Sequence, residues 1–196
     1  MDLPVYLLDI DENGETEVDY IALVDKPAVQ MSWKKFADDK RLKFEIQDEE
    51  ERIISGVLML ADKPIYRNDE EGEYYVMFTK DTIKKIAQKF FEKGYQSNVN
   101  LMHDSGQRVE GLTMFESFIT DEKRGIQPMK GFEDVPDGSW FGSFKVNNDE
   151  VWEKIKSGEF TGYSVEGLFQ YKRKEMRENL SEEQILERIK ELLRSI

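Results

Sequence analysis

The sequence predicts an α+β fold that is mainly β, a mostly antiparallel β-barrel of about seven strands decorated with helices. Short stretches rich in aromatic and β-branched residues recur along the chain and are typical of strands. Two amphipathic helical patterns lie between these stretches, and a third follows the last one. Strands and helices do not alternate strictly, which argues against a doubly wound parallel sheet.

The composition limits the classes of function. The chain has 196 residues, no cysteine and a formal net charge of −13 at pH 7. The lack of cysteine excludes disulfides and thiolate metal sites. An acidic surface repels phosphate backbones and anionic lipids, so neither nucleic acid nor a membrane is an expected partner. No secretory signal pattern and no apolar run of about 20 residues is visible.

The N-terminal half is predicted to contain strands. Residues 3–10 and 16–24 have strand-like patterns, and Asn13-Gly14 between them is a strong hairpin signal. The run Ile53 to Ala61 is almost continuously apolar and predicts a buried strand. The segment Tyr74 to Phe78 predicts another strand from its aromatic and β-branched content.

The helical patterns interrupt the strands. Apolar residues between Ile83 and Phe91 fall on one helical face, and Gly94 ends the pattern. The polar segment Asn147 to Glu150 caps a second, short helix. The remaining strands are predicted at Val99–His103, Val109–Ile119, Trp140–Val146 and Tyr163–Tyr171.

The C-terminal segment reads as an appendage. Lys172 to Asn179 is almost entirely polar, and Ser181 with Gln184 forms a capping box at the start of a third helix. We therefore expect a barrel domain over residues 1–171, and a polar connector with an amphipathic helix over residues 172–196.

His103 is the only histidine in the chain and lies at the end of a predicted strand. A serine hydroxyl becomes a good nucleophile only when a neighbouring base accepts its proton. Histidine suits this role because its unperturbed pKa is about 6.5. Any serine–histidine pair here must use His103. A lone histidine is more often structural, and this alternative stays open at this point.

Ser164 lies in the segment Gly162-Tyr163-Ser164-Val165-Glu166-Gly167. Because side chains alternate along a strand, Ser164 and Glu166 share one face. Burying both in an apolar core would be unfavourable, so this face should meet solvent or a polar cleft. Glu166 stands where the Gly-x-Ser-x-Gly elbow of α/β-hydrolases has its second glycine, which excludes that motif. A plain solvent-exposed strand face is the alternative.

The sequence gives no sign of a metal or cofactor site. One histidine without cysteine argues against zinc. The acidic run Asp69-Glu70-Glu71 lacks the spacing of a calcium loop, and no glycine-rich phosphate loop occurs. We therefore expect no cofactor and no bound metal.

Six short segments stand in a specific order along the chain. They are Ile54–Met59, Lys63–Arg67, Tyr74–Phe78, Asn100–Asp104, Glu116–Phe118 and Gly162–Gly167. Their order and spacing resemble the XkdF-type serine proteases of tailed phages, from about Val18 to about Phe169. That family is related to the prohead maturation proteases, which are similar in fold to the herpesvirus assembly protease, a mostly antiparallel barrel with surrounding helices.

The resemblance implies roles for two residues, with Ser164 as the nucleophile and His103 as its base. In the better-known prohead proteases, the acid precedes a Leu-Val-x-x-Pro-Ala segment that follows the serine. Here Leu23-Val24-Asp25-Lys26-Pro27-Ala28 lies near the N-terminus instead. The resemblance therefore implies a circular permutation in which the strand that closes the barrel has moved to the front.

The acidic member of the implied triad has three candidates in this sequence. Aligning on the Leu-Val segment places Tyr20 at the position of the acid, one residue from Asp19. Asp19 is therefore the first candidate for the residue that orients His103. Glu17 and Glu166 are the alternatives.

The resemblance implies an endopeptidase that cuts scaffold proteins and a segment of the major capsid protein inside the assembling prohead, in the host cytoplasm. A homo-oligomer is compatible with this function. The first alternative is an inactive protease fold that serves as a structural or scaffold-binding part of the capsid. A further alternative is an acidic, chaperone-like module that binds basic partners.

Overall fold

The computed structural model describes residues 3–11, 16–25, 43–69, 72–104 and 108–173. In these ranges the strands are β1 (Val5–Asp9), β2 (Val18–Val24), β3 (Glu45–Asp48), β4 (Ile53–Met59), β5 (Ile65–Asp69), β6 (Gly72–Phe78), β7 (Val99–Leu101), β8 (Leu112–Ile119), β9 (Trp140–Val146), β10 (Gly162–Gly167) and β11 (Gln170–Arg173). The α-helices are α1 (Lys80–Glu92) and α2 (Asp149–Lys156). Two short 3-10 helices cover Tyr95–Ser97 and Glu122–Arg124. The predicted mainly β fold with helices is confirmed.

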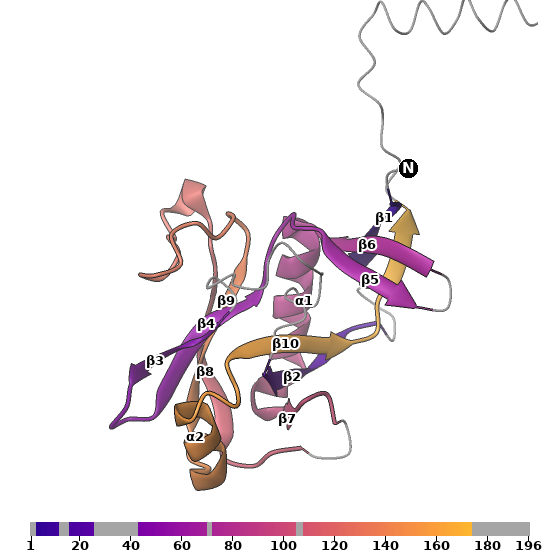
Figure 1. Ribbon diagram of the computed structural model, residues 1–196. Helices are drawn as coiled ribbons and strands as arrows, with labels where there is room; N and C mark the ends of the chain where they lie inside the picture. The colour runs from indigo at the N-terminus through magenta and orange to yellow at the C-terminus, as the bar shows by residue number, and fades with distance from the viewer. Residues whose placement is uncertain (1–2, 12–15, 26–42, 70–71, 105–107, 174–196) are drawn as a thin grey trace, which may run out of the picture.

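The strands form three open sheets that surround α1 (Figure 1). Their strand orders are β11-β1-β6-β5, β10-β2-β7 and β3-β4-β9-β8. Most neighbouring strands run antiparallel, as predicted, and the exceptions are the parallel pairs β1–β6 and β2–β7. Side chains from all three sheets and from both helices meet in one main hydrophobic core.

The prediction of a closed barrel is wrong for the part of the chain that the structure describes. Closure requires one continuous ladder around all strands. Here the β10-β2-β7 sheet meets the β3-β4-β9-β8 sheet through the isolated bridge between Lys43 and Gly162. The α1 helix occupies the space between the sheets (Figure 1).

The predicted helix over residues 83–91 is confirmed as α1. It begins after Thr79, whose hydroxyl accepts a hydrogen bond from the Thr82 amide at 3.2 Å. Most of its apolar face is buried, although Phe91 is 39% exposed. The Phe90 ring packs edge-on against Trp140 with centroids 5.5 Å apart. Gly94 follows in the left-handed region with φ of 73°, which glycine adopts without strain. The predicted short helix is also confirmed as α2.

The predicted N-terminal hairpin is wrong. Both strands exist, but β1 pairs with β6 and β11, while β2 pairs with β7 and β10. The Asn13-Gly14 turn lies outside the described residues. Ile21, Ala22 and Leu23 of β2 are fully buried. A strand buried on both faces is typical of a sheet interior, so neighbours from distant parts of the chain satisfy both of its edges.

The predicted last strand, Tyr163–Tyr171, is divided between two sheets. β10 pairs with β2, and β11 pairs with β1 and runs past the predicted domain boundary to Arg173. The Lys172 ammonium lies 2.6 Å from the Asp9 carboxylate across the β11–β1 pair. Residues 174–196, with the predicted C-terminal helix, lie outside the described residues. The domain boundary therefore stays a prediction.

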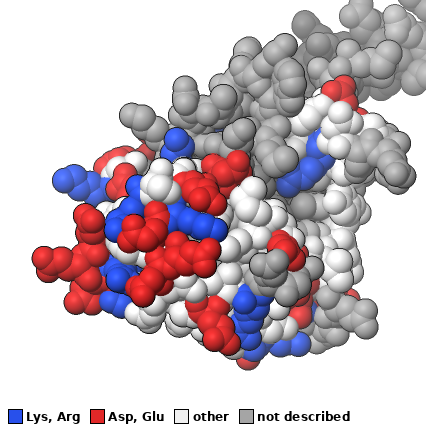
Figure 2. All heavy atoms as spheres, turned by 60° about the horizontal axis from the view of Figure 1, so that its bottom comes forward, with Lys and Arg blue, Asp and Glu red and all other residues white. Residues whose placement is uncertain are grey.

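The surface near α2 carries charges of both signs. Figure 2 shows acidic and basic side chains intermixed on this side of the molecule, where Lys156 lies 2.7 Å from Glu153 and Arg52 lies 2.6 Å from Asp149. Exposed pairs of this kind contribute about 0–1 kcal/mol each. Packing in the core, rather than these pairs, therefore holds the fold together. Neither described α-helix has the length and apolar character needed to span a bilayer.

The close crossing of β10 over the chain that leads into β2 depends on Gly167. A Cβ atom at Gly167 would lie 2.1 Å from the Glu17 carbonyl oxygen and 2.7 Å from Val18 Cα. Both are backbone atoms, so relief requires a shift of the strands. We expect Gly167→Ala to lower the free energy of unfolding by about 2–3 kcal/mol, measured from urea midpoints.

The matched control is Gly142→Ala, because the nearest atom to its added methyl group is the Leu58 side-chain Cδ1 at 2.9 Å, which can rotate away. We expect a smaller loss there. Equal losses in the two variants would contradict the tight crossing at Gly167.

Candidate active site

The candidate site is built on the β10-β2-β7 sheet. Ala22 on β2 is the cross-strand partner of Ser164 on β10 and of Asn100 on β7. Side chains directly opposite on adjacent strands share a face. Ser164, Ala22 and Asn100 therefore form one row across the sheet, and all three are buried, with 4%, 0% and 0% of their surface exposed. The small Ala22 side chain leaves the two polar groups on either side without a bulky residue between them.

Glu166 lies two residues after Ser164, so its side chain emerges from the same face of β10. Its carboxylate accepts a hydrogen bond from Asn100 Nδ2 at 2.7 Å, and its side chain is 28% exposed. This charge-assisted hydrogen bond between Asn100 and Glu166 connects β7 to β10. Alternation along β10 thus places Ser164 and Glu166 on one face, but the alternative of a plain solvent-exposed face is wrong for Ser164, which is 4% exposed.

His103 lies in a turn that directly follows β7. Met102 and His103 have φ angles of 52° and 62°, in the left-handed region that residues other than glycine rarely adopt. The turn is closed by a hydrogen bond of 3.0 Å from the Asp104 amide to the Leu101 carbonyl. A second bond of 3.0 Å, from the Met102 amide to the Leu23 carbonyl, ties it to β2. The predicted strand over Val99–His103 therefore ends at Leu101.

This turn brings the imidazole to the carboxylate of Glu166. His103 Nδ1 lies 3.4 Å from Glu166 Oε2, a distance long for a hydrogen bond and within the range of an ion pair. The His103 side chain is 44% exposed. With Nδ1 toward the carboxylate, Nε2 on the opposite side of the ring is the nitrogen left to exchange a proton with another group. An acid at Nδ1 is the arrangement that orients histidine in Ser-His-acid triads.

Asp19, the first sequence candidate for the acid, lies beside this contact without joining it. Its neighbour Tyr20 is the cross-strand partner of Glu166. Burial raises the pKa of the Asp19 carboxyl, its own backbone amide offsets part of this, and the Glu166 and Glu17 carboxylates raise the pKa further. Among the described residues, the carboxylate that pairs with His103 is that of Glu166.

Glu17, the other alternative, is engaged elsewhere. Tyr95 donates its hydroxyl proton to Glu17 Oε1 at 2.8 Å. The ammonium groups of Lys89 and Lys93 lie 3.7 Å and 3.8 Å from Glu17 Oε2. These contacts attach the segment before β2 to α1 and the 3-10 helix that follows it. Glu17 therefore helps to hold β2, the central strand of the site, against α1, and does not contact His103.

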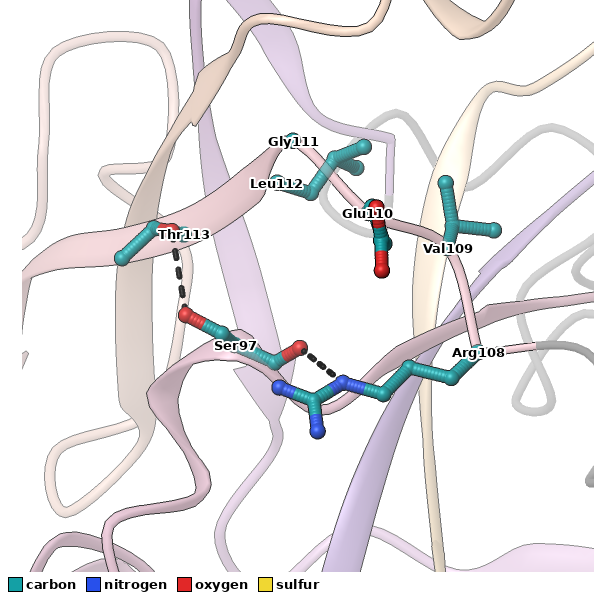
Figure 3. A pocket seen from close by; sticks show the side chains of 7 residues that line it. All are labelled: Ser97, Arg108, Val109, Glu110, Gly111, Leu112 and Thr113. Carbon is teal, nitrogen blue, oxygen red and sulfur yellow. Dashed lines mark hydrogen bonds between the residues drawn. The ribbon is translucent and has the colours of Figure 1, made fainter.

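A cavity of about 300 Å³ lies on the far side of β7. Arg108, which lines it, forms an isolated bridge with Asn100 and donates from Nε to the Ser97 carbonyl at 3.2 Å (Figure 3). Ser97 and Thr113 share a hydrogen bond of 3.0 Å between their hydroxyls on the same wall. Glu110 also lines the cavity. One cation and one carboxylate give it no preference for ligand charge.

The described part of the chain contains no group of three His, Asp or Glu side chains arranged to hold a metal ion. The residues of the candidate site offer a hydroxyl, an imidazole, a carboxylate and a buried amide.

Comparisons with known proteins agree with the resemblance seen in the sequence. The profile of the family described as "Putative phage serine protease XkdF" matches residues 41–172. This chain belongs to the XkdF family. The matched range runs from just before β3 into β11 and includes His103, Ser164 and Glu166, whereas β1 and β2 precede it.

Two curated proteins of Bacillus subtilis (strain 168) are similar to this XkdF-family chain. The phage-like element PBSX protein XkdF is 26% identical over 164 residues, which cover 80% of this chain and 54% of the relative. The uncharacterized protein YqbD is 27% identical over 158 residues, which cover 77% of this chain and 44% of that protein. The chain thus spans about half the length of these relatives. No solved structure matches the chain, so the circular permutation stays a prediction.

Asn100 was not among the residues predicted to be functional. A signal was present, because an amide between the apolar residues Val99 and Leu101 in a strand needs a hydrogen-bond partner when it is buried. The left-handed turn at Met102 and His103 was not predictable from the local sequence, because the turn lacks the glycine that usually marks this conformation.

The left-handed turn can be tested at Met102, which is 52% exposed and so loses little packing when replaced. Asparagine tolerates this conformation well, while β-branched valine does not. We expect Met102→Asn to keep or raise the free energy of unfolding, and Met102→Val to lower it by about 1–2 kcal/mol. Urea denaturation measures both. Equal stabilities of the two variants would show that the turn is not left-handed in solution.

Proposed function

We propose that the chain is a serine endopeptidase in which Ser164 is the nucleophile, His103 is the general base, and Glu166 orients the imidazole. The observation that carries the proposal is the 3.4 Å contact between His103 Nδ1 and Glu166 Oε2, with Ser164 two residues from Glu166 on the same strand face. Membership of a family described as a phage serine protease supports the same chemistry.

The proposed mechanism is acyl transfer in two steps. Ser164 Oγ attacks the scissile carbonyl carbon while His103 Nε2 accepts the hydroxyl proton. The imidazolium then gives this proton to the leaving amine as the peptide bond breaks and an acyl-enzyme ester remains. Water attacks the ester while the imidazole accepts its proton, which returns to Ser164 Oγ as the acid product leaves. The Glu166 carboxylate stabilises the imidazolium in both steps.

We assign the orienting role to Glu166 in preference to Asp19. An orienting acid must lie at Nδ1 and must be ionised when the imidazole accepts a proton. Glu166 has this position, and its Oε2 accepts a hydrogen bond from Asn100 Nδ2 at 2.7 Å. Burial and the neighbouring carboxylates raise the pKa of Asp19, which weakens its suitability as a permanent anion.

The biological role that we propose is maturation of the phage prohead. The substrates would be scaffold protein and a segment of the major capsid protein, cut inside the immature shell. The resemblance to prohead proteases and the description of the family support this role. An acidic surface also suits an enzyme whose substrates are proteins and not the packaged nucleic acid.

The second candidate function is a protease fold without activity that binds scaffold protein. The observation in its favour is the burial of Ser164, which exposes only 4% of its surface. A substrate carbonyl reaches Ser164 Oγ only if the neighbouring chain moves aside. The two candidates differ in whether Ser164 reacts.

Labelling with a fluorophosphonate probe separates the two candidates. We expect the full chain to be labelled at Ser164, because an activated serine attacks the phosphorus centre, and we expect Ser164→Ala to abolish labelling and the cleavage of co-expressed scaffold protein. The exposed Ser157 serves as the control, since Ser157→Ala leaves the site intact. Cleavage that persists in Ser164→Ala would exclude Ser164 as the nucleophile.

The identity of the acid is tested by Glu166→Gln and Asp19→Asn. We expect Glu166→Gln to lower the labelling rate by about 100-fold or more, since the neutral amide no longer stabilises the imidazolium. We expect Asp19→Asn to change the rate by less than about threefold, within ordinary variation for a neighbouring residue. The reverse pattern would return the orienting role to Asp19.

Asp19→Asn has a second expected effect, on stability against pH. The pKa of Asp19 is raised in the folded state above its ordinary value of 3.8, so its contribution to stability is present at low pH and is lost as the pH rises through the raised pKa. Asparagine does not ionise, so the stability of the Asp19→Asn variant does not fall in this way as the pH rises. We expect the variant to be more stable than the parent at pH 7, with the gain disappearing below pH 3.8. An unchanged stability difference across this range would contradict the raised pKa.

A further inference from the structure

Asn100 is the most deeply buried polar residue near the candidate site, with 0% of its surface exposed. Its Nδ2 donates to Glu166 Oε2 at 2.7 Å, whereas its Oδ1 is buried without a hydrogen-bond partner among the described residues. The opposite orientation of the amide would put Oδ1 against a carboxylate oxygen, two acceptors in contact. The chemistry of Glu166 therefore determines which way the amide points.

The two contacts of the carboxylate converge on a single atom. Glu166 Oε2 accepts a hydrogen bond from Asn100 Nδ2 at 2.7 Å and lies 3.4 Å from His103 Nδ1. The shorter, charge-assisted bond is the stronger of the two, and it comes from a residue fixed inside a strand. The longer contact comes from an exposed ring on a turn. The position of Oε2 is therefore set mainly by Asn100.

The unpartnered oxygen indicates that stability alone does not explain this residue. A buried acceptor without a partner costs about 1–3 kcal/mol. An apolar side chain of similar size, such as leucine, would avoid that cost in the middle of β7. Buried polar groups that lower the stability of the fold are typical of functional sites.

We propose that Asn100 is a positioning residue that holds the Glu166 carboxylate against Nδ1 of His103. This inference rests on the proposed function for its catalytic meaning. By holding Oε2 at Nδ1, Asn100 selects the imidazole tautomer that carries its proton on Nδ1 and leaves Nε2 as the free base. Asn100 itself touches neither Nε2 nor the substrate in this scheme.

The single histidine makes the test direct, because a sample labelled with nitrogen-15 histidine gives the signals of one ring. At a pH where the nitrogen-15 shifts themselves identify a neutral ring, they also report its tautomer. We expect the parent chain to show mainly the Nδ1–H form. We expect both Asn100→Leu and the isosteric Asn100→Asp to shift the ring to mainly the Nε2–H form, and to slow fluorophosphonate labelling by about tenfold or more.

The matched control is Asn98→Leu, two residues earlier, where the lost bond of 3.0 Å runs to the Asp19 carbonyl and not to Glu166. We expect no change of tautomer there. A merely structural role for Asn100 predicts that Asn100→Leu lowers the urea midpoint and leaves the tautomer unchanged, and that result would overturn the proposal. A parent chain without the Nδ1–H form would overturn it as well. Failure of the proposed function appears separately, as an unlabelled Ser164 in the parent chain.

Discussion

The enclosure of β2 between β10 and β7 is the constraint on which the site depends. Ile21, Ala22 and Leu23 expose none of their surface, so this strand must have neighbours on both edges. One neighbour runs antiparallel and the other parallel, and a parallel neighbour requires a long crossover connection. The chain between β2 and β7 supplies that crossover and places α1 in the core. His103 and Ser164, distant in sequence, are thereby attached to the two strands that flank β2 in one sheet.

The local elements of this fold were largely predictable from the sequence. The α1 segment has the hydrophobic pattern of a helix, and the β9 segment has that of a strand. Asn148 caps the start of α2. Short-range patterns were therefore sufficient to predict these three elements. β3 and β5 were missed, since the first is exposed and polar and the second follows Pro64. The arrangement into three open sheets was not predictable, because strand pairing depends on contacts between distant segments. The hairpin signal at Asn13-Gly14 was overridden by such contacts.

The site was predictable in part, and for different reasons at each residue. Resemblance to the XkdF family singled out Ser164 and His103, while alternation along β10 placed Glu166 on the face of Ser164. The contact between Glu166 and His103 depends on the direction of the turn after β7, and the left-handed conformation of that turn has no sequence signature here. A one-dimensional alignment therefore favoured Asp19, although the folded chain brings Glu166 to the imidazole.

The pairing of β2 with β10 also has a temporal consequence. Ribosomes deliver a chain from its N-terminus, so β2 and β7 emerge well before the strand that bears Ser164. Until then one edge of β2 has no strand to pair with, and the serine and its neighbouring carboxylate do not yet exist beside the imidazole. In the proposed function, Ser164 and Glu166 therefore reach the imidazole only after β10 has been synthesised, so the site cannot form before that point.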